Sequence, residues 1–270
     1  CWSCRRIGRI QINLKNSWGF MPPAYISTMS KFSKNYLNKI NKILNKILEE
    51  EDKKITECAK LIRDSYKKGG QLYIFGTGHS RLLGEEAFHR AGGYAAACPI
   101  RDDNLTFKKG ATKATSLERT PNIARKALQK YKITRKDVLM IVSNSGVNHA
   151  PVEAAIVAKE RGIKSIALTS VKYSKKAPLS KLNKKLYELV DIFIDNKIPP
   201  GDTIININKF SVGPASTITG SFILNSILIE LASMLKTEKI FPFYISSNMP
   251  NASKNNNKLE NKFRKINPHL

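Results

Sequence analysis

Two short polar loops carry the residue types that could bind an anion, and each follows an apolar segment. The first is Gly76-Thr77-Gly78-His79-Ser80, directly after the apolar residues 72–75. Glycine permits backbone conformations that a side chain would forbid, and Ser80 is placed to cap the helix that residues 82–90 predict. A strand, a tight loop and a helix start leave backbone N–H groups and the positive end of the helix dipole pointing at one spot. The loop therefore predicts a site for a phosphate or carboxylate group.

The residues at the end of this loop exclude two better-known phosphate loops. A dinucleotide fingerprint needs a third glycine where Arg81 stands, and no acidic residue after a second strand is placed to bind a ribose. A nucleoside-triphosphate loop ends in Gly-Lys-Ser/Thr, whereas this one ends in Gly78-His79-Ser80. We therefore expect no nucleotide cofactor.

A second loop of the same kind follows the apolar strand that residues 138–142 predict. It reads Ser143-Asn144-Ser145-Gly146-Val147-Asn148-His149, and a helix is predicted over 151–159 with a proline in its first turn. Carboxyl ends of parallel strands meet at one edge of a sheet, so we expect the two loops to build one site. The expected phosphate ligands are Ser80, Ser143, Ser145 and Asn148, and the alternative is that these side chains only cap helices and turns.

Three motifs together resemble the SIS domain, the sugar isomerase fold that binds phosphosugars. They are Phe75-Gly76-Thr77-Gly78-His79-Ser80 with Glu85-Glu86, then Ser143-Asn144-Ser145-Gly146, then Val212-Gly213-Pro214-Ala215-Ser216-Thr217. The resemblance is strongest to bacterial SIS proteins related to phosphoheptose isomerase and N-acetylmuramic acid 6-phosphate etherase. It implies a three-layer αβα sandwich around a five-stranded, mainly parallel sheet of flavodoxin-like or Rossmann-like topology. It also adds Gly78, Asn144, Ser216 and Thr217 to the expected phosphosugar contacts.

The resemblance covers nearly the whole chain, from about Met29 to the C-terminus. We therefore expect an SIS domain over residues 29–270. Residues 1–28 are expected to be a disordered or non-core extension, because their apolar residues follow no clean period.

For catalysis, the resemblance implies a general base on the helix after the glycine loop, often reaching the site of a neighbouring subunit. Glu86 matches that position, with Glu85 second, and burial can raise the pKa of such a carboxyl towards neutrality. The alternative is a solvated glutamate paired with Arg90 at i, i+4.

Glu118 is a second candidate, because the related etherases use another glutamate in a comparable segment. Their lysine after the Ser-Thr pair is not matched at Ile218 or Thr219, however, which weakens the lyase hypothesis. Isomerases of this fold place a histidine early in the final core helix, and residues 217–228 contain none. His79 is a candidate for that role, or a simple hydrogen-bond donor to the ligand.

Two functions from different classes follow. One is a sugar-phosphate isomerase or etherase-like lyase that uses carboxylate acid–base chemistry without a nucleotide cofactor. The other is a non-catalytic phosphosugar sensor. The resemblance further implies a homo-oligomer, a dimer or tetramer, in the cytoplasm.

The remaining elements follow from apolar periodicity. We expect a helix over 31–68 with a candidate break at the acidic run 49–52, strands at 94–100, 164–169, 190–194 and 202–207, an irregular loop over the site at 101–115, and an apolar helix at 222–235 buried by the sheet.

The size and net charge of the chain indicate which kinds of partner it could bind. The 270 residues, 41% of them hydrophobic, suffice for one sizeable core, and their net charge of +25 raises nucleic acid as a partner. The lysines are spread along the chain without a recognition motif, so we expect nucleic acid not to be the partner and the charge to attract an anionic sugar phosphate. No apolar run approaches the roughly 18 residues of a membrane span.

The four cysteines argue against a structural metal. Cys1 and Cys4 form a lone Cys-x-x-Cys, and Cys58 and Cys98 stand singly, whereas a zinc knuckle needs four ligands. We expect no metal site, and unclustered thiols fit a reducing compartment.

Overall fold

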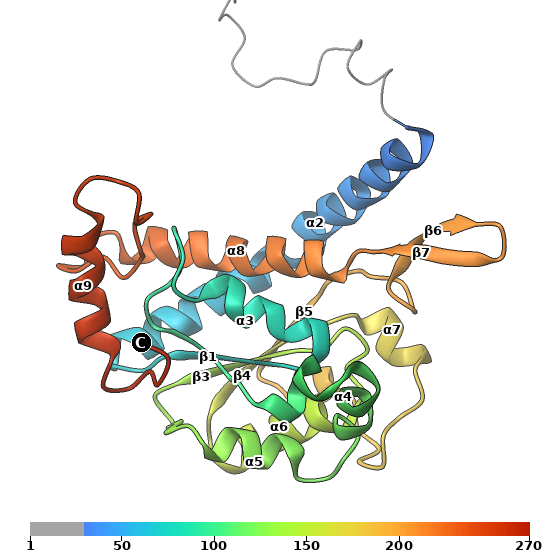
Figure 1. Ribbon diagram of the computed structural model, residues 1–270, viewed down its shortest axis with the longest axis horizontal. Helices are drawn as coiled ribbons and strands as arrows, with labels where there is room; N and C mark the ends of the chain where they lie inside the picture. Colours follow the sequence, from blue (N-terminus) through green and yellow to red (C-terminus); the bar gives the residue numbers. More distant parts are fainter. Residues whose placement is uncertain (1–29) are drawn as a thin grey trace, which may run out of the picture.

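A parallel sheet of five strands forms the centre of the computed structural model, which describes residues 30–270 (Figure 1). The strands are β1 (Leu72–Gly76), β2 (Ala97–Pro99), β3 (Val138–Val142), β4 (Lys164–Thr169) and β5 (Ile192–Asp195). Their spatial order is β2-β1-β3-β4-β5, and every pairing in this sheet is parallel. This is the flavodoxin-like order, so the predicted α/β sandwich is confirmed. Residues 1–28, the expected extension, lie outside the described residues.

Helices cover both faces of the sheet, and α2 (Lys31–Lys67), α3 (Leu82–Ala87) and α8 (Ser216–Leu235) lie on one of them (Figure 1). The other face carries α5 (Ile123–Gln129) and α6 (His149–Glu160), and α4 (Ala111–Leu117), α7 (Val171–Lys176) and α9 (Ala252–Phe263) lie around the edges. Side chains of β1 alternate between two separate apolar clusters: Ile74 belongs to the first and Phe75 to the second. Burial on both faces explains why β1 and β3 are apolar at nearly every position.

Helix α2 is continuous over its 37 residues, so the candidate break at 49–52 is wrong. The side chain of Ser30 caps its start by accepting from the N–H of Ser33 at 3.2 Å. Glu51 faces inwards and is only 3% exposed, and its carboxylate pairs with Lys197 and with Lys54. Paired in this way, an acidic residue fits the buried face of a helix.

Residues 202–207 do not add a strand to the main sheet as the sequence predicted. Strand β6 (Thr203–Ile207) pairs antiparallel with β7 (Phe210–Pro214), which was not predicted, in a separate hairpin that projects from the body (Figure 1). A two-residue turn joins them, and Asn208 adopts the left-handed φ of 53° that such turns require. The hydroxyl of Tyr36 on α2 donates to the Pro214 carbonyl at 2.6 Å, which ties the hairpin to the helix.

The segment expected as an irregular loop is ordered into short helices. It contains 3₁₀ turns at Asp103–Leu105 and Phe107–Lys109, followed by α4. Phe107, Ala114 and Thr115 of this segment line the cavity described below, so it does lie over the site.

Helix α8 starts at Ser216, six residues before the predicted 222. Within residues 30–270 it is the helix whose length and composition would allow it to cross a membrane. Its buried residues belong to the core cluster that it shares with α2, and buried core helices pass the same test.

This packing predicts that Ile227→Ala lowers the free energy of unfolding by about 2–5 kcal/mol, because Ile227 is fully buried in the core cluster that α8 shares with α2. The matched control is Ile229→Ala on the same helix, whose side chain is 68% exposed. Urea titration followed by circular dichroism measures both. Equal losses for the two variants would contradict this placement of α8.

Candidate functional site

The two glycine- and serine-rich loops leave the sheet side by side. Strands β1 and β3 pair in register from Leu72 opposite Val138 to Gly76 opposite Val142, so both loops start at the same edge. Between them lies a cavity of about 300 Å³. Its lining residues come from five segments: Thr77, Gly78, His79, Ser80, Phe107, Ala114, Thr115, Glu118, Ser143, Asn144, Ser145, Asn148, Tyr173 and Asp202. The prediction that the two loops meet at one edge is confirmed.

The first loop folds tightly because of its glycines. A Cβ atom on Gly76 would lie 2.6 Å from the backbone carbon of Ser80, and Gly78 adopts a φ of +51°. The sequence predicted Ser80 as a helix cap, which is wrong. Ser80 lies inside a 3₁₀ turn (Gly78–Arg81), and its N–H donates to the Thr77 carbonyl at 2.9 Å. Its hydroxyl borders the cavity and bonds to no other group within residues 30–270.

The second loop is fixed by contacts that do not use the backbone N–H groups of Asn144 and Ser145. Gly146 adopts a φ of +61°, and a Cβ there would lie 2.6 Å from the hydroxyl of Thr169, so no other residue fits. The Ser174 hydroxyl donates to the Ser145 carbonyl at 2.5 Å, and the Gly146 N–H donates to the Ser143 hydroxyl at 3.2 Å. For the backbone N–H groups of Asn144 and Ser145, the described part of the chain provides no acceptor. These amides, with the Ser145 hydroxyl, are available to an anion.

Asn144 carries an unused donor at the same place. Its side-chain oxygen accepts from the amide of Asn196 at 3.0 Å, which fixes the orientation of the group. Its Nδ2 is buried and has no partner among the residues described. A buried unpaired donor is costly, so this amide fits an acceptor oxygen from a ligand. No pattern in the sequence pointed to Asn196, which follows β5 and lies beside Asn144 only because of the fold.

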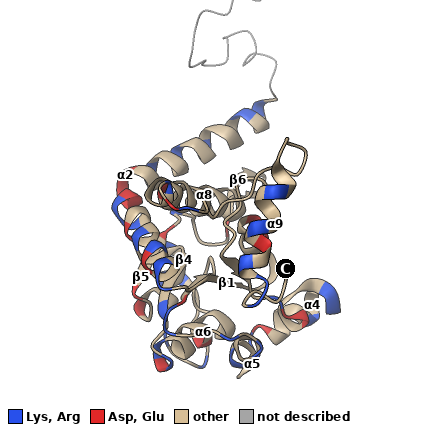
Figure 2. Ribbon diagram, turned by 90° about the vertical axis from the view of Figure 1, so that its left-hand side faces the viewer, with Lys and Arg blue, Asp and Glu red and all other residues tan. Residues whose placement is uncertain are grey.

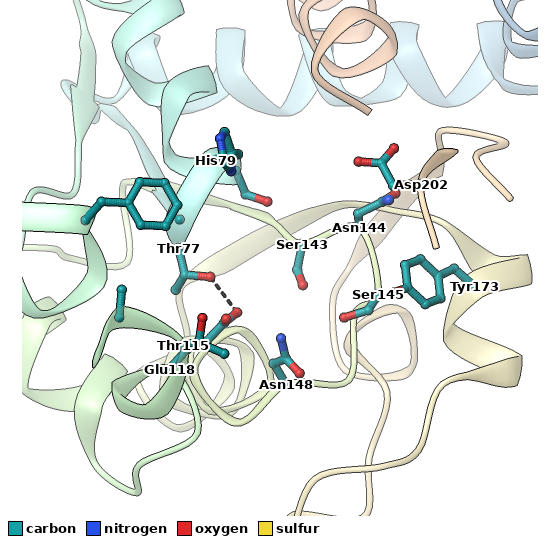
Figure 3. Close-up of a pocket in the computed structure, with 14 residues that line it drawn as sticks. Thr77, His79, Thr115, Glu118, Ser143, Asn144, Ser145, Asn148, Tyr173 and Asp202 are labelled. Carbon is teal, nitrogen blue, oxygen red and sulfur yellow. Dashed lines mark hydrogen bonds between the residues drawn. The ribbon is translucent and has the colours of Figure 1, made fainter. Parts of the chain in front are cut away.

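Glu118 presents a carboxylate to the cavity, and two contacts fix it there. The Thr77 hydroxyl donates to Glu118 Oε1 at 2.6 Å, across the cavity from Ser143 and Ser145 (Figure 3). The N–H of Ala150, in the first turn of α6, donates to the Glu118 carbonyl at 3.0 Å. The carboxylate is thus held beside both loops and keeps a second oxygen for other partners.

Glu85 and Glu86 do not line this cavity. Arg101 donates to both oxygens of Glu85, at 3.0 and 2.5 Å, and this hydrogen-bonded guanidinium lowers the pKa of the Glu85 carboxyl. Glu86 pairs with Arg90 at 2.5 Å and accepts from the side chain of Asn225 at 3.4 Å. Within the subunit, the ion pair that we gave as the alternative for Glu86 is therefore present.

The other predicted residues divide between two places. His79 lines the main cavity, where its ring lies 5.0 Å from that of Phe107. Ser216 and Thr217 line a small adjoining cavity instead. The Ser216 hydroxyl and N–H both donate to the Asp202 carboxylate, at 2.6 and 2.8 Å.

Asp202, Thr77 and Tyr173 line the cavity although the sequence did not single them out. Thr77 lies within the first loop motif and was the easiest to find. Asp202 follows Gly201 at a left-handed φ of 67°, a turn whose position only the fold reveals. Within residues 30–270, no group of three His, Cys, Asp or Glu side chains could hold a metal ion.

Fold and site together define the class of protein. The SIS domain family matches residues 35–170, and the chain belongs to this family. Its relatives include UPF0309 proteins from Brucella canis and Brucella ovis, each 37% identical over 244 residues, which are 90% of this chain and 100% of theirs. Phosphoheptose isomerase from Neisseria gonorrhoeae shares the fold with a TM-score of 0.52 at 14% identity, over 75% of this chain and 98% of that one.

The Glu85–Arg101 pair predicts a pH-dependent contribution to stability. A carboxyl whose pKa is lowered by folding stabilises the protein above its unfolded pKa of about 4.3, and this stabilisation is lost as the pH falls through the lowered folded value. The melting temperature of wild type should therefore exceed that of Glu85→Gln at pH 7, and this difference in melting temperature should shrink below about pH 4. Calorimetry between pH 3 and pH 7 measures it, with the exposed Asp103→Asn as the control. A difference that does not change with pH would contradict the pairing.

Proposed function

We propose that the protein binds a sugar phosphate in the main cavity and acts on it as an isomerase or lyase, by general acid–base catalysis without a nucleotide cofactor. The supporting observation is that free backbone amides and free hydroxyls line the cavity that also holds the Glu118 carboxylate, with the buried, unpartnered side-chain amide of Asn144 beside them. The phosphate lies against loops 78–80 and 143–145. The sugar then extends towards Glu118 and His79, in a volume at the small end of the range for ligand sites.

The chemistry assigned to Glu118 is proton transfer. As a base, its free oxygen takes the proton from the carbon next to the sugar's carbonyl, and as an acid it returns the proton to the neighbouring carbon. Thr77 orients the carboxylate through its hydroxyl, and His79 exchanges a proton with a sugar oxygen. The same base would serve a lyase, in which proton removal is followed by loss of the group on the next carbon.

Glu86 can act as the general base that the SIS resemblance implies only in the site of a neighbouring subunit. It lies on α3, outside the cavity of its own subunit, and its partner Asn225 is on an exposed position of α8. We propose a homo-oligomer, dimer or tetramer, in which this face meets a neighbouring site. The SIS domain of residues 29–270 is the unit that assembles.

A non-catalytic phosphosugar sensor is the second candidate. It is favoured by the ion pairs of Glu85 and Glu86, because these are the carboxylates that match the general base of the isomerases of this fold. In a sensor the same loops would hold the phosphate, and Glu118 would bind a sugar hydroxyl.

The charge and the thiols fit either candidate. Lys and Arg lie on many elements, including α2, α5 and α9, and not along one recognition helix (Figure 2). We therefore propose an anionic small molecule as the partner and not nucleic acid, because a net charge of +25 attracts such ligands. Cys58 and Cys98 are buried and free, which fits the cytoplasm, where we place the protein.

Glu118→Gln separates the two candidates. The variant keeps the shape and the hydrogen bond from Thr77 but loses the base, so turnover should fall by about 100-fold or more while ligand-induced thermal stabilisation remains. NMR of wild type, Glu118→Gln and Glu86→Gln with hexose, heptose and N-acetylhexosamine phosphates gives the rates. Stabilisation of wild type without turnover of any of them would favour the sensor, and no stabilisation by any would contradict both.

Ser145→Ala tests the phosphate position. Loss of a hydroxyl that donates to a charged oxygen costs about 1.5–3 kcal/mol, so the dissociation constant should rise by about tenfold or more. Isothermal calorimetry measures it, with Ser253→Ala on the exposed face of α9 as the control. Equal affinities for both variants would place the phosphate elsewhere.

A further inference from the structure

A second cavity, of about 370 Å³, adjoins the main one at the start of α6. It is lined by Arg119, Asn148, His149 and the segment Pro178–Lys181. Asn148 lines both cavities, and Arg119 directly follows Glu118 of the main cavity. The two cavities are therefore neighbours with one lining residue in common.

The positive groups of this second cavity are left unpaired. The arginines that lie within 4.0 Å of a carboxylate are Arg63, Arg81, Arg90, Arg101, Arg125 and Arg264. Arg119 and Lys181 have no carboxylate within that distance in the part of the chain that the structure describes, and none lines the cavity. By contrast, a cavity beside β4 holds Lys164 already neutralised by Asp191 at 2.5 Å.

Glu153, one turn after His149 on α6, is engaged by other groups. The Glu153 carboxylate accepts from the N–H groups of Asn122, Ala124 and Arg125, at 2.7, 2.8 and 3.2 Å, and so caps the start of α5. Its contact with the buried His149 ring is longer, 3.7 Å. His149 is also the first residue of α6, so the positive end of a 12-residue helix adds to the field of Arg119 and Lys181.

We propose that the second cavity binds a second acidic group of the ligand, so that the substrates of this site are sugar phosphates that carry another phosphate or a carboxylate. This inference rests on the proposed function, since the first phosphate is taken to lie in the main cavity. A guanidinium presents paired N–H groups that match either acid, and Lys181 adds a second positive charge to the same cavity. The neutral sugar ring lies between the two anionic ends, beside Asn148.

The test compares matched ligands that differ only in the second acid. Isothermal calorimetry measures wild type with glucose, fructose and mannose 6-phosphates and with the corresponding 1,6-bisphosphates. We expect at least one bisphosphate to bind about tenfold or more tightly than its monophosphate at low salt, and this preference to fall steeply at high salt.

The variant Arg119→Ala/Lys181→Ala should lose the preference and keep its affinity for the monophosphate. Both side chains are exposed, so the fold should persist, and the melting temperature checks this. The control Lys126→Ala/Arg161→Ala removes the same charge, from α5 and from the far end of α6, and should keep the preference.

Each outcome separates the two proposals. Monophosphate binding by wild type without any preference for a bisphosphate would overturn the second site and leave the proposed function standing. An equal loss of preference in the control variant would also overturn it, because net charge alone would then explain the effect. If no ligand bound, the proposed function itself would fail.

Discussion

The site depends on the register of two neighbouring parallel strands. Because Gly76 pairs with Val142 at the end of the β1–β3 ladder, the two loops begin at the same height and face one cavity. The N–H of Ser143 donates to the Leu168 carbonyl of β4 at 3.1 Å, which extends the same alignment to a third strand. A slip of one residue would turn the buried side chains to the opposite face, so the core fixes the register and the register fixes the site.

A buried charge cluster connects this edge of the sheet to α2. Lys197 pairs with Glu51 of α2, with Glu50 at 2.9 Å and with Asp195 at 3.4 Å. Burial alone would lower the pKa of Lys197, but the hydrogen bonds that its ammonium donates to Glu51 and Glu50 outweigh this effect and raise the pKa. Asn196, between Asp195 and Lys197, orients the side-chain amide of Asn144. The ion pairs therefore hold the turn that fixes the direction of the Asn144 N–H groups. Replacing Lys197 by a neutral residue would leave these three carboxylates without the cation that they share.

The sequence predicted those parts of the fold and site that depend on local pattern. Residues 138–142 are an apolar run, residues 164–169 contain the apolar stretch 166–168, and both segments are strands with the predicted bounds. The hairpin was missed because its second strand, Phe210–Pro214, is exposed and lacks a core-facing pattern. The two cavity loops were found from glycine and serine positions, and the Glu86–Arg90 pair from its i, i+4 spacing. The partners of Glu118 and Asn144 are instead set by contacts between distant segments. Motif position favoured Glu86, and only the fold shows that Glu118 is the glutamate that faces this subunit's cavity.

Asp202 decides where a ligand's phosphate can lie. The N-terminus of α8 would itself attract an anion, but the Asp202 carboxylate already accepts from the N–H of Ala215 at 3.3 Å and from both donors of Ser216. Two anions cannot share these donors, since like charges in contact repel strongly in a partly buried site. The backbone amides of Asn144 and Ser145 have no such competitor among the described residues. Under the proposed function, a ligand's phosphate would therefore bind at loops 78–80 and 143–145, and Asp202, on the cavity wall, would accept from hydroxyls of the sugar.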